Sequence, residues 1–162
     1  MNLAHQITEA FATRQMPEWV ADTSRPRISD REDAESLNHF SRERLDWPLL
    51  QKHADALYAM TPAAFRYYLP RFMVIAMERS DITPLFISPI LQMLDSGPDE
   101  TYWSDCFRDF WLGMTIAEYD AVKGWLVFMA SSDDFGLDDV VLARCFDTLD
   151  LLSRAGGVEQ PK

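Results

Sequence analysis

Apolar residues recur at intervals of three and four along most of the chain, which is the spacing of one face of an α-helix. A first stripe of this kind is formed by Leu3, Ile7, Ala10 and Phe11. It predicts a short helix, which Pro17 ends. No segment sustains the strict alternation that is typical of a half-buried strand. We therefore expect an all-α fold, with six or seven helices in a single compact domain over residues 1–162.

Cap residues followed by proline mark where several predicted helices begin. Proline fits the first helical turn, since the N–H that it lacks would have no partner there. Thr61-Pro62 opens the clearest of these helices, whose predicted buried face is Phe65, Leu69, Phe72 and Ala76. Pro70 lies inside this helix, where it removes one backbone hydrogen bond. We expect a kink or a break at Pro70.

The last third of the chain carries the most regular pattern. Thr115 and Glu118 have the spacing of a capping box, in which each side chain satisfies a free N–H at the helix start. Gly124 lies within the helix that follows and indicates the close approach of a neighbouring helix. A final helix is expected over about residues 137–154, and Gly156-Gly157 is expected to give it a left-handed end.

Two segments without a period are expected to be irregular. Residues 21–29 are polar and hold a proline, so they predict a surface connection, after which Asp30 is expected to cap a helix. Residues 156–162 are expected to form a flexible tail. Arg25, Arg27 and Arg31 make a local basic patch, which we expect to pair with the acidic surface of the chain itself.

The net charge of the chain indicates which kinds of partner it could bind. The chain has 15 Lys and Arg against 26 Asp and Glu, a net charge of −11. Residues 99–162 hold the largest surplus, with thirteen acids and five bases. Such a surface repels phosphate backbones and anionic lipid headgroups and attracts basic groups. We therefore expect no nucleic-acid partner and no membrane, and a basic protein is the candidate partner.

The sequence lacks the usual signatures of catalysis. His5, His39 and His53 form no helical ligand pair, so a zinc or di-iron site lacks its ligands. Cys106 and Cys145 lack metal-ligand spacing and are expected to be free, mostly buried thiols of a cytoplasmic protein. There is no nucleophile motif and no Gly-rich phosphate loop. We expect no catalytic residue, no cofactor and no metal.

One segment is distinctive enough to compare with a known family. Thr61–Phe72 reads TPAAFRYYLPRF. It resembles a bacterial family of uncharacterised proteins whose hallmark is a mid-chain Pro-x-Ala-Phe-Arg-Tyr-Tyr-Leu-Pro segment. Other similar pieces are Ile7 with Ala10-Phe11, the acidic cluster 30–33, Trp47, and Ala121-Val122 with Trp125-Leu126. The resemblance implies a bacterial source and a helical domain, and it implies no activity.

The same segment contains the first candidate site. Arg66, Tyr67 and Tyr68, with Trp47, would hold an anionic ligand or a carboxylate of a partner beside Pro70. The alternative interpretation is structural. In that interpretation Tyr68 anchors the core, Arg66 pairs with an acid from elsewhere in the chain, and Pro70 sets the bend.

The second candidate set is acidic and lies around the final predicted helix. It consists of Asp133, Asp134, Asp138, Asp139, Asp147 and Asp150. A calcium loop needs a glycine at its sixth place and a terminal glutamate in register, which this segment does not supply. Acids at a helix start are favoured by its dipole and free N–H groups, so capping is one expected role. A face for a basic partner is the other.

These observations favour a non-catalytic, acidic interaction protein that docks on a basic protein, in the manner of an immunity protein against a cationic toxin. The alternative is an enzyme or a small-ligand-binding protein with its pocket at the Pro70 bend. A homodimer formed through exposed aromatic residues, such as Trp103 or Trp111, fits either hypothesis.

Overall fold

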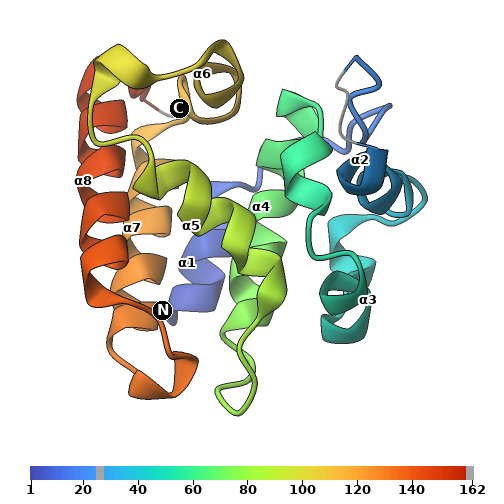
Figure 1. Cartoon of the computed structure of the whole chain (residues 1–162), viewed down its shortest axis with the longest axis horizontal. Coiled ribbons are helices and arrows are strands. Elements are labelled where there is room, and N and C mark those ends of the chain that lie inside the picture. Colours follow the sequence, from blue (N-terminus) through green and yellow to red (C-terminus); the bar gives the residue numbers. More distant parts are fainter. Residues whose placement is uncertain (25–27, 160–162) are drawn as a thin grey trace. The chain divides into compact units, whose positions relative to one another are not determined.

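Every regular element of the described chain is helical. The computed structural model describes residues 1–24 and 28–159, which hold eight α-helices and five short 3₁₀ turns (Figure 1). The α-helices are α1 Leu3–Ala10, α2 Ile28–Glu35, α3 Trp47–Lys52, α4 Pro62–Ala76, α5 Ser88–Asp95, α6 Asp105–Trp111, α7 Ile116–Ala130 and α8 Asp139–Gly156. The predicted all-α class is confirmed, whereas the predicted count of six or seven helices is wrong. The additional helix is α6, whose seven residues are too few to display a helical period.

Contacts divide the chain into two compact units, which we describe separately. Unit 1 comprises Met1–Ala10 and Leu91–Lys162, and unit 2 comprises Phe11–Ile90. The single domain expected over residues 1–162 stays a prediction. Within the two described stretches, no helix combines the length and the hydropathy that crossing a bilayer requires.

Helix α7 is the centre of unit 1, because it packs against both α1 and α8 (Figure 1). The contact with α1 explains Gly124: a Cβ atom at this position would lie 3.3 Å from Cδ1 of Leu3. The predicted close approach of a neighbouring helix is therefore confirmed. The largest fully buried side chains of unit 1 are Trp111, Trp125, Tyr119, Phe110 and Phe135.

The start of α7 is fixed by the predicted capping box. The Thr115 hydroxyl accepts a hydrogen bond from the Glu118 N–H at 3.1 Å, and the Glu118 carboxylate accepts one from the Thr115 N–H at 2.8 Å. Glu118 is completely buried. Its carboxylate is stable there because the cap supplies a hydrogen-bond donor in place of water.

Two tryptophans that were expected to be exposed are buried in unit 1. Trp103 is 7% exposed and donates a hydrogen bond from Nε1 to the carbonyl oxygen of Gly97 at 2.7 Å. Trp111 is fully buried, and the Tyr119 hydroxyl donates to its carbonyl oxygen at 2.7 Å. The expectation that Trp103 and Trp111 offer a homodimer surface is therefore wrong. Large aromatic side chains bury too much apolar area to be left in water when a core can take them.

The end of α8 also differs from the prediction. Gly157 has φ −64°, so the left-handed end expected at Gly156-Gly157 is wrong. The chain continues in an extended form, in which Val158 accepts a hydrogen bond from the Ile116 N–H and donates one to the Met114 carbonyl oxygen. This pairing holds Val158, which lies in the predicted flexible tail 156–162. Residues 160–162 of that tail lie outside the described residues.

In unit 2, α4 is the central helix. Its N-cap is Thr61, whose hydroxyl accepts a hydrogen bond from the Ala64 N–H at 3.2 Å, as predicted. The predicted inner face, Phe65, Leu69, Phe72 and Ala76, is fully buried. Packed against α4 are α3 and the 3₁₀ turns Arg42–Arg44 and Leu85–Ile87.

Pro70 does not break α4, which runs without interruption from Pro62 to Ala76. The predicted break is therefore wrong. A proline in a helix interior costs about 3 kcal/mol through the lost hydrogen bond and the crowded carbonyl. Ten of the fifteen residues of α4 are buried, and their packing offsets that cost.

The connection between α1 and α2 is more ordered in its first part than its composition suggests. Ala21 forms an isolated β-bridge with Met60, and Asp22 accepts hydrogen bonds from the N–H and hydroxyl of Ser24. Asp30 is not a cap, because α2 already begins at Ile28 and Asp30 is buried in its first turn. Residues 25–27, which include Arg25 and Arg27 of the predicted basic patch, lie outside the described residues.

The capping box gives a direct test of unit 1. We expect Thr115→Ala to lower the free energy of unfolding by about 1–2 kcal/mol, because the Glu118 N–H loses its acceptor. Urea unfolding followed by circular dichroism measures this change. Thr115→Ser keeps the hydroxyl and is the matched control, expected to stay within about 0.5 kcal/mol of the unmodified protein. Equal losses in the two variants would contradict the role of the cap.

Candidate functional site

The two tyrosines of the first candidate site are buried in unit 2. Their rings meet edge to face, with centroids 4.8 Å apart. Tyr68 is fully buried, and its hydroxyl donates to the carbonyl oxygen of Phe40 at 2.6 Å, with that of Leu37 at 3.3 Å. Tyr67 is 5% exposed, and its hydroxyl accepts a hydrogen bond from the Arg42 N–H at 3.2 Å. Both hydroxyls therefore join α4 to the segment that precedes α3.

Burial raises the pKa of the Tyr68 hydroxyl to about 12, with smaller contributions from Tyr67 and Glu43. The folded protein thus favours the neutral phenol more than the unfolded chain, where tyrosine titrates near about 10. The stabilisation that this group supplies is complete below about pH 10 and is lost as the pH rises from about 10 to about 12. Tyr68 is accordingly a neutral hydrogen-bond donor at physiological pH.

Arg42 contacts Tyr67, which is the kind of contact that the sequence predicted for Arg66. Its guanidinium carbon lies 4.8 Å from the centroid of the Tyr67 ring, and its Nη1 donates to the carbonyl oxygen of Phe11 at 3.1 Å. Arg66 is half-buried and has an interaction partner of its own. Because Arg42 is 25 residues from Tyr67 in the chain, no local motif could have identified it.

Trp47 belongs to a different aromatic cluster of unit 2. Its ring meets Phe86 edge to face with centroids 5.1 Å apart, and the Arg79 guanidinium lies 5.5 Å from its centroid. These contacts favour the structural interpretation of the first candidate site.

The six carboxylates of the second set all come from the 3₁₀ turn Asp133–Phe135 and from α8 with its cap. Asp138 is the N-cap of α8, and its carboxylate accepts a hydrogen bond from the Val140 N–H at 2.8 Å. Asp139 is the first residue of α8. The predicted capping role is thus confirmed for Asp138. Asp133 and Asp134 are exposed in the preceding turn.

A surface groove in unit 1 adds apolar surface to this acidic set. It lies between α7 and α8, has a volume of about 360 Å³, and is lined mainly by Leu126, Val127, Ala130, Leu142, Ala143 and Phe146. Two of the predicted acids, Asp139 and Asp147, complete its lining. The groove therefore combines an apolar floor with carboxylates at two points along α8.

A lysine close to this groove shows how a positive charge is accommodated there. Lys123 Nζ lies 2.5 Å from an Asp150 carboxylate oxygen and 5.6 Å from the ring centroid of Phe146, which lines the groove. Within residues 1–24 and 28–159, Asp150 is the one member of the predicted set that forms an ion pair. Asp138 lies within the electrostatic influence of Arg144, and the remaining four carboxylates form no ion pair with another described residue.

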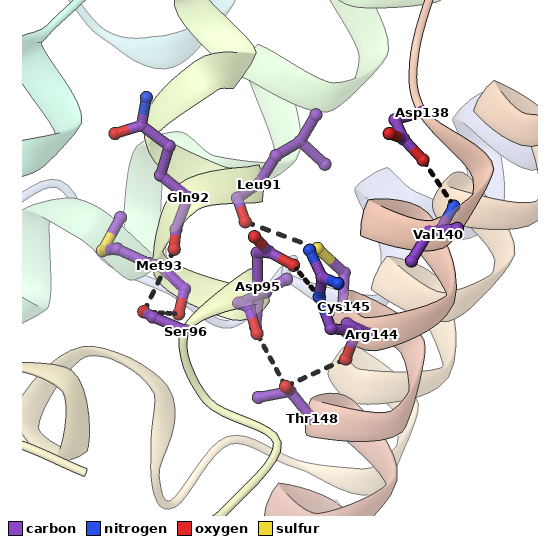
Figure 2. A network of polar contacts seen from close by, with 11 residues as sticks. Leu91, Gln92, Met93, Asp95, Ser96, Asp138, Val140, Arg144, Cys145 and Thr148 are labelled. Carbon is purple, nitrogen blue, oxygen red and sulfur yellow. Dashed lines mark hydrogen bonds and ion pairs between the residues drawn. The ribbon is translucent and has the colours of Figure 1, made fainter. Parts of the chain in front are cut away.

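On α8, a polar network ties α5 in place (Figure 2). The Cys145 thiol donates to the Leu91 carbonyl oxygen at 3.4 Å, and the Thr148 hydroxyl donates to that of Leu94 at 2.6 Å. Arg144 pairs with Asp95 at 2.5 Å. Burial raises the pKa of the Cys145 thiol to about 12, so it remains protonated at neutral pH. A nucleophilic or redox role, which needs an accessible thiolate, is not supported for this cysteine.

Among the described residues, no three His, Cys, Asp or Glu side chains are grouped so that they could hold a metal ion. His53 Nδ1 lies 3.1 Å from Oδ1 of Asp33. The other carboxylate oxygen of Asp33 accepts a hydrogen bond from the Asp55 N–H.

Sequence reasoning found the acids of unit 1 and missed the groove between them. It assigned one buried face to α7, through Tyr119, Val122, Leu126 and Met129. Val127 lies off that face and is 59% exposed. Apolar residues on more than one side of a surface helix were the signal that could have indicated a second contact surface.

Comparisons of this chain with protein-family models, with curated proteins and with solved structures gave no match. The resemblance of Thr61–Phe72 to a bacterial family therefore stays a prediction, and function must be inferred from the geometry.

The buried tyrosine hydroxyl can be tested by removing it. We expect Tyr68→Phe to lower the free energy of unfolding by about 1–2 kcal/mol, because the Phe40 carbonyl oxygen is left without its donor. Tyr102→Phe, at a tyrosine that is 78% exposed, is the matched control and should have no measurable effect. Urea unfolding measures both. An unchanged stability of Tyr68→Phe would show that this hydrogen bond is not part of the core.

The state of Cys145 can be tested by chemical labelling. In a Cys106→Ser variant we expect iodoacetamide at pH 8 to modify Cys145 at least about a hundredfold more slowly in the native protein than in urea, since burial excludes the reagent and holds the thiol protonated. Mass spectrometry of quenched samples gives both rates. Comparable native and denatured rates would contradict the buried position of Cys145.

Proposed function

We propose that this protein is a non-catalytic, acidic interaction protein that docks on a basic protein partner. The observation that carries the proposal is the surplus of acidic over basic residues in unit 1. The segment 116–156, which spans α7 and α8, holds eight acids and three bases. Of the six predicted carboxylates here, Asp150 is the one that forms an ion pair among the described residues.

Electrostatics explains why such a surface selects a basic partner. Charges on one side of a protein add to a potential that draws in oppositely charged proteins and disfavours others. The same field repels nucleic acid and anionic lipid. An immunity-like role, in which the acidic protein covers and neutralises a cationic toxin, is the concrete form that we propose. The two free cysteines fit a reducing compartment, and we propose the bacterial cytoplasm as the location.

A ligand-binding or enzymatic role at Pro70 has less support. The hydroxyls of Tyr67 and Tyr68 are engaged by Arg42 and Phe40, so they are not available to a ligand without rearrangement of unit 2. We therefore retain the docking role as the proposed function.

Affinity capture at two salt concentrations tests the proposal. We expect the immobilised protein to retain a basic protein from lysate of the source cells at about 50 mM salt. The purified pair should then bind at least about tenfold more weakly at about 500 mM salt, because salt screens the attraction between exposed charges. Mass spectrometry identifies the partner, and titration calorimetry measures the binary affinity. A partner that is neutral or acidic, or an affinity that does not change with salt, would contradict the proposal.

A further inference from the structure

The groove between α7 and α8 presents an apolar surface that the described chain leaves open. Val127, which lines it, is 59% exposed, and Ala130 and Ala143 on its two sides are also exposed. Exposed apolar surface of this kind, bordered by charged residues, is typical of a protein-binding site. Its lining comes from side chains of two neighbouring helices, which is typical of a groove that receives a third helix.

Charge restricts what can occupy this groove. Asp139 and Asp147 line it directly, and neither forms an ion pair with another described residue. A second copy of this chain, with a net charge of −11, would bring further negative charge against them. A purely apolar segment would cover the two carboxylates without replacing their water. The complementary occupant is a segment that carries apolar side chains together with lysine or arginine.

Lys123 provides an internal precedent for this arrangement. Its ammonium group lies over the Phe146 ring and pairs with the Asp150 carboxylate, one helical turn beyond Asp147 on α8. The adjoining groove repeats the same elements, an apolar wall and a carboxylate, at Asp147 and again at Asp139. A cation from a partner would therefore meet surroundings that the chain already uses for its own lysine.

We infer that the groove between α7 and α8 binds a basic amphipathic helix of the partner, with apolar side chains against Leu126, Val127 and Phe146 and cations on Asp139 and Asp147. This inference rests on the proposed function and names the place and the form of the docking. Asp147 follows Asp139 by eight positions, which corresponds to about 12 Å along α8. Two basic residues about two turns apart on the partner helix have a matching separation.

The test uses a synthetic probe, because the natural partner is not identified. The probe is a fluorescein-labelled, alanine-based peptide of about 18 residues, with leucines on one helical face and lysines about two turns apart beside them. A second peptide has the same composition in scrambled order, so that charge is kept and the apolar face is lost. Fluorescence anisotropy measures the affinity of the full chain for both peptides at low and high salt.

Two pairs of matched variants locate the binding. Val127→Ser removes an apolar side chain of the groove, and Val140→Ser is its control, because Val140 is 60% exposed and does not line the groove. The double variant Asp139→Asn with Asp147→Asn removes two charges of the groove. Glu32→Gln with Glu78→Gln removes two exposed charges of unit 2 as its control. Thermal unfolding confirms that each variant is folded.

We expect Val127→Ser and the Asp139 and Asp147 double variant each to weaken binding of the amphipathic peptide by at least about fivefold. Both controls should remain within about twofold of the unmodified protein. The scrambled peptide should bind at least about tenfold more weakly than the amphipathic one, since it cannot present apolar side chains to the floor.

Other outcomes separate this inference from the proposed function. If both peptides bind in a salt-dependent way and the groove variants behave like their controls, the basic partner docks elsewhere, so the inference fails and the proposed function stands. If neither peptide binds with salt dependence, both fail. Concentration-dependent dimerisation that Val127→Ser abolishes would show a second copy in the groove and would also overturn the inference.

Discussion

Helix α7 carries more apolar surface than α1 and α8 cover, and the arrangement of unit 1 depends on how this surplus is distributed. Val122 and Met129 are fully buried, while Val127 remains 59% exposed on the same helix. Apolar area left in water costs roughly 25 cal/mol per Å² relative to burial. Covering the exposed apolar surface of α7 is therefore favourable. Val127 lies beside two carboxylates, since Asp139 and Asp147 line the same groove.

The helices that could be predicted are those whose ends are determined locally. Thr61 and Thr115 satisfy N–H groups only three residues away, so their sequence patterns hold in the folded chain. Pro70 and Gly157 were misjudged because their surroundings come from distant residues. The packing of buried residues keeps α4 helical at Pro70. The pairing of Val158 with Met114 and Ile116 keeps the adjacent Gly157 extended. Composition gives the propensity of a segment, and tertiary contacts decide whether that propensity is followed.

The same distinction applies to the candidate sites. The acids of α8 were identified because charge can be counted in a sequence, whereas the groove required two helices to be placed side by side. The tyrosines of α4 were distinctive in sequence for a reason that only the structure reveals. Tyr67 accepts a hydrogen bond from Arg42, and Tyr68 donates one to Phe40, so both tyrosines join α4 to the segment before α3. The unusual motif is therefore explained by packing and hydrogen bonding inside unit 2. A distinctive motif is therefore no stronger an argument for a ligand than for a core.

The hydrogen bonds from Cys145 and Thr148 to α5 have a consequence for how the chain acquires its structure. The carbonyl groups that they satisfy, at Leu91 and Leu94, lie 54 residues earlier in the sequence. The Leu94 carbonyl oxygen also accepts a local hydrogen bond from the Gly97 N–H at 3.1 Å, so the Thr148 hydroxyl uses its second acceptor site. The hydrogen bonds between α5 and α8 can therefore form only after the last helix of the chain has been synthesised.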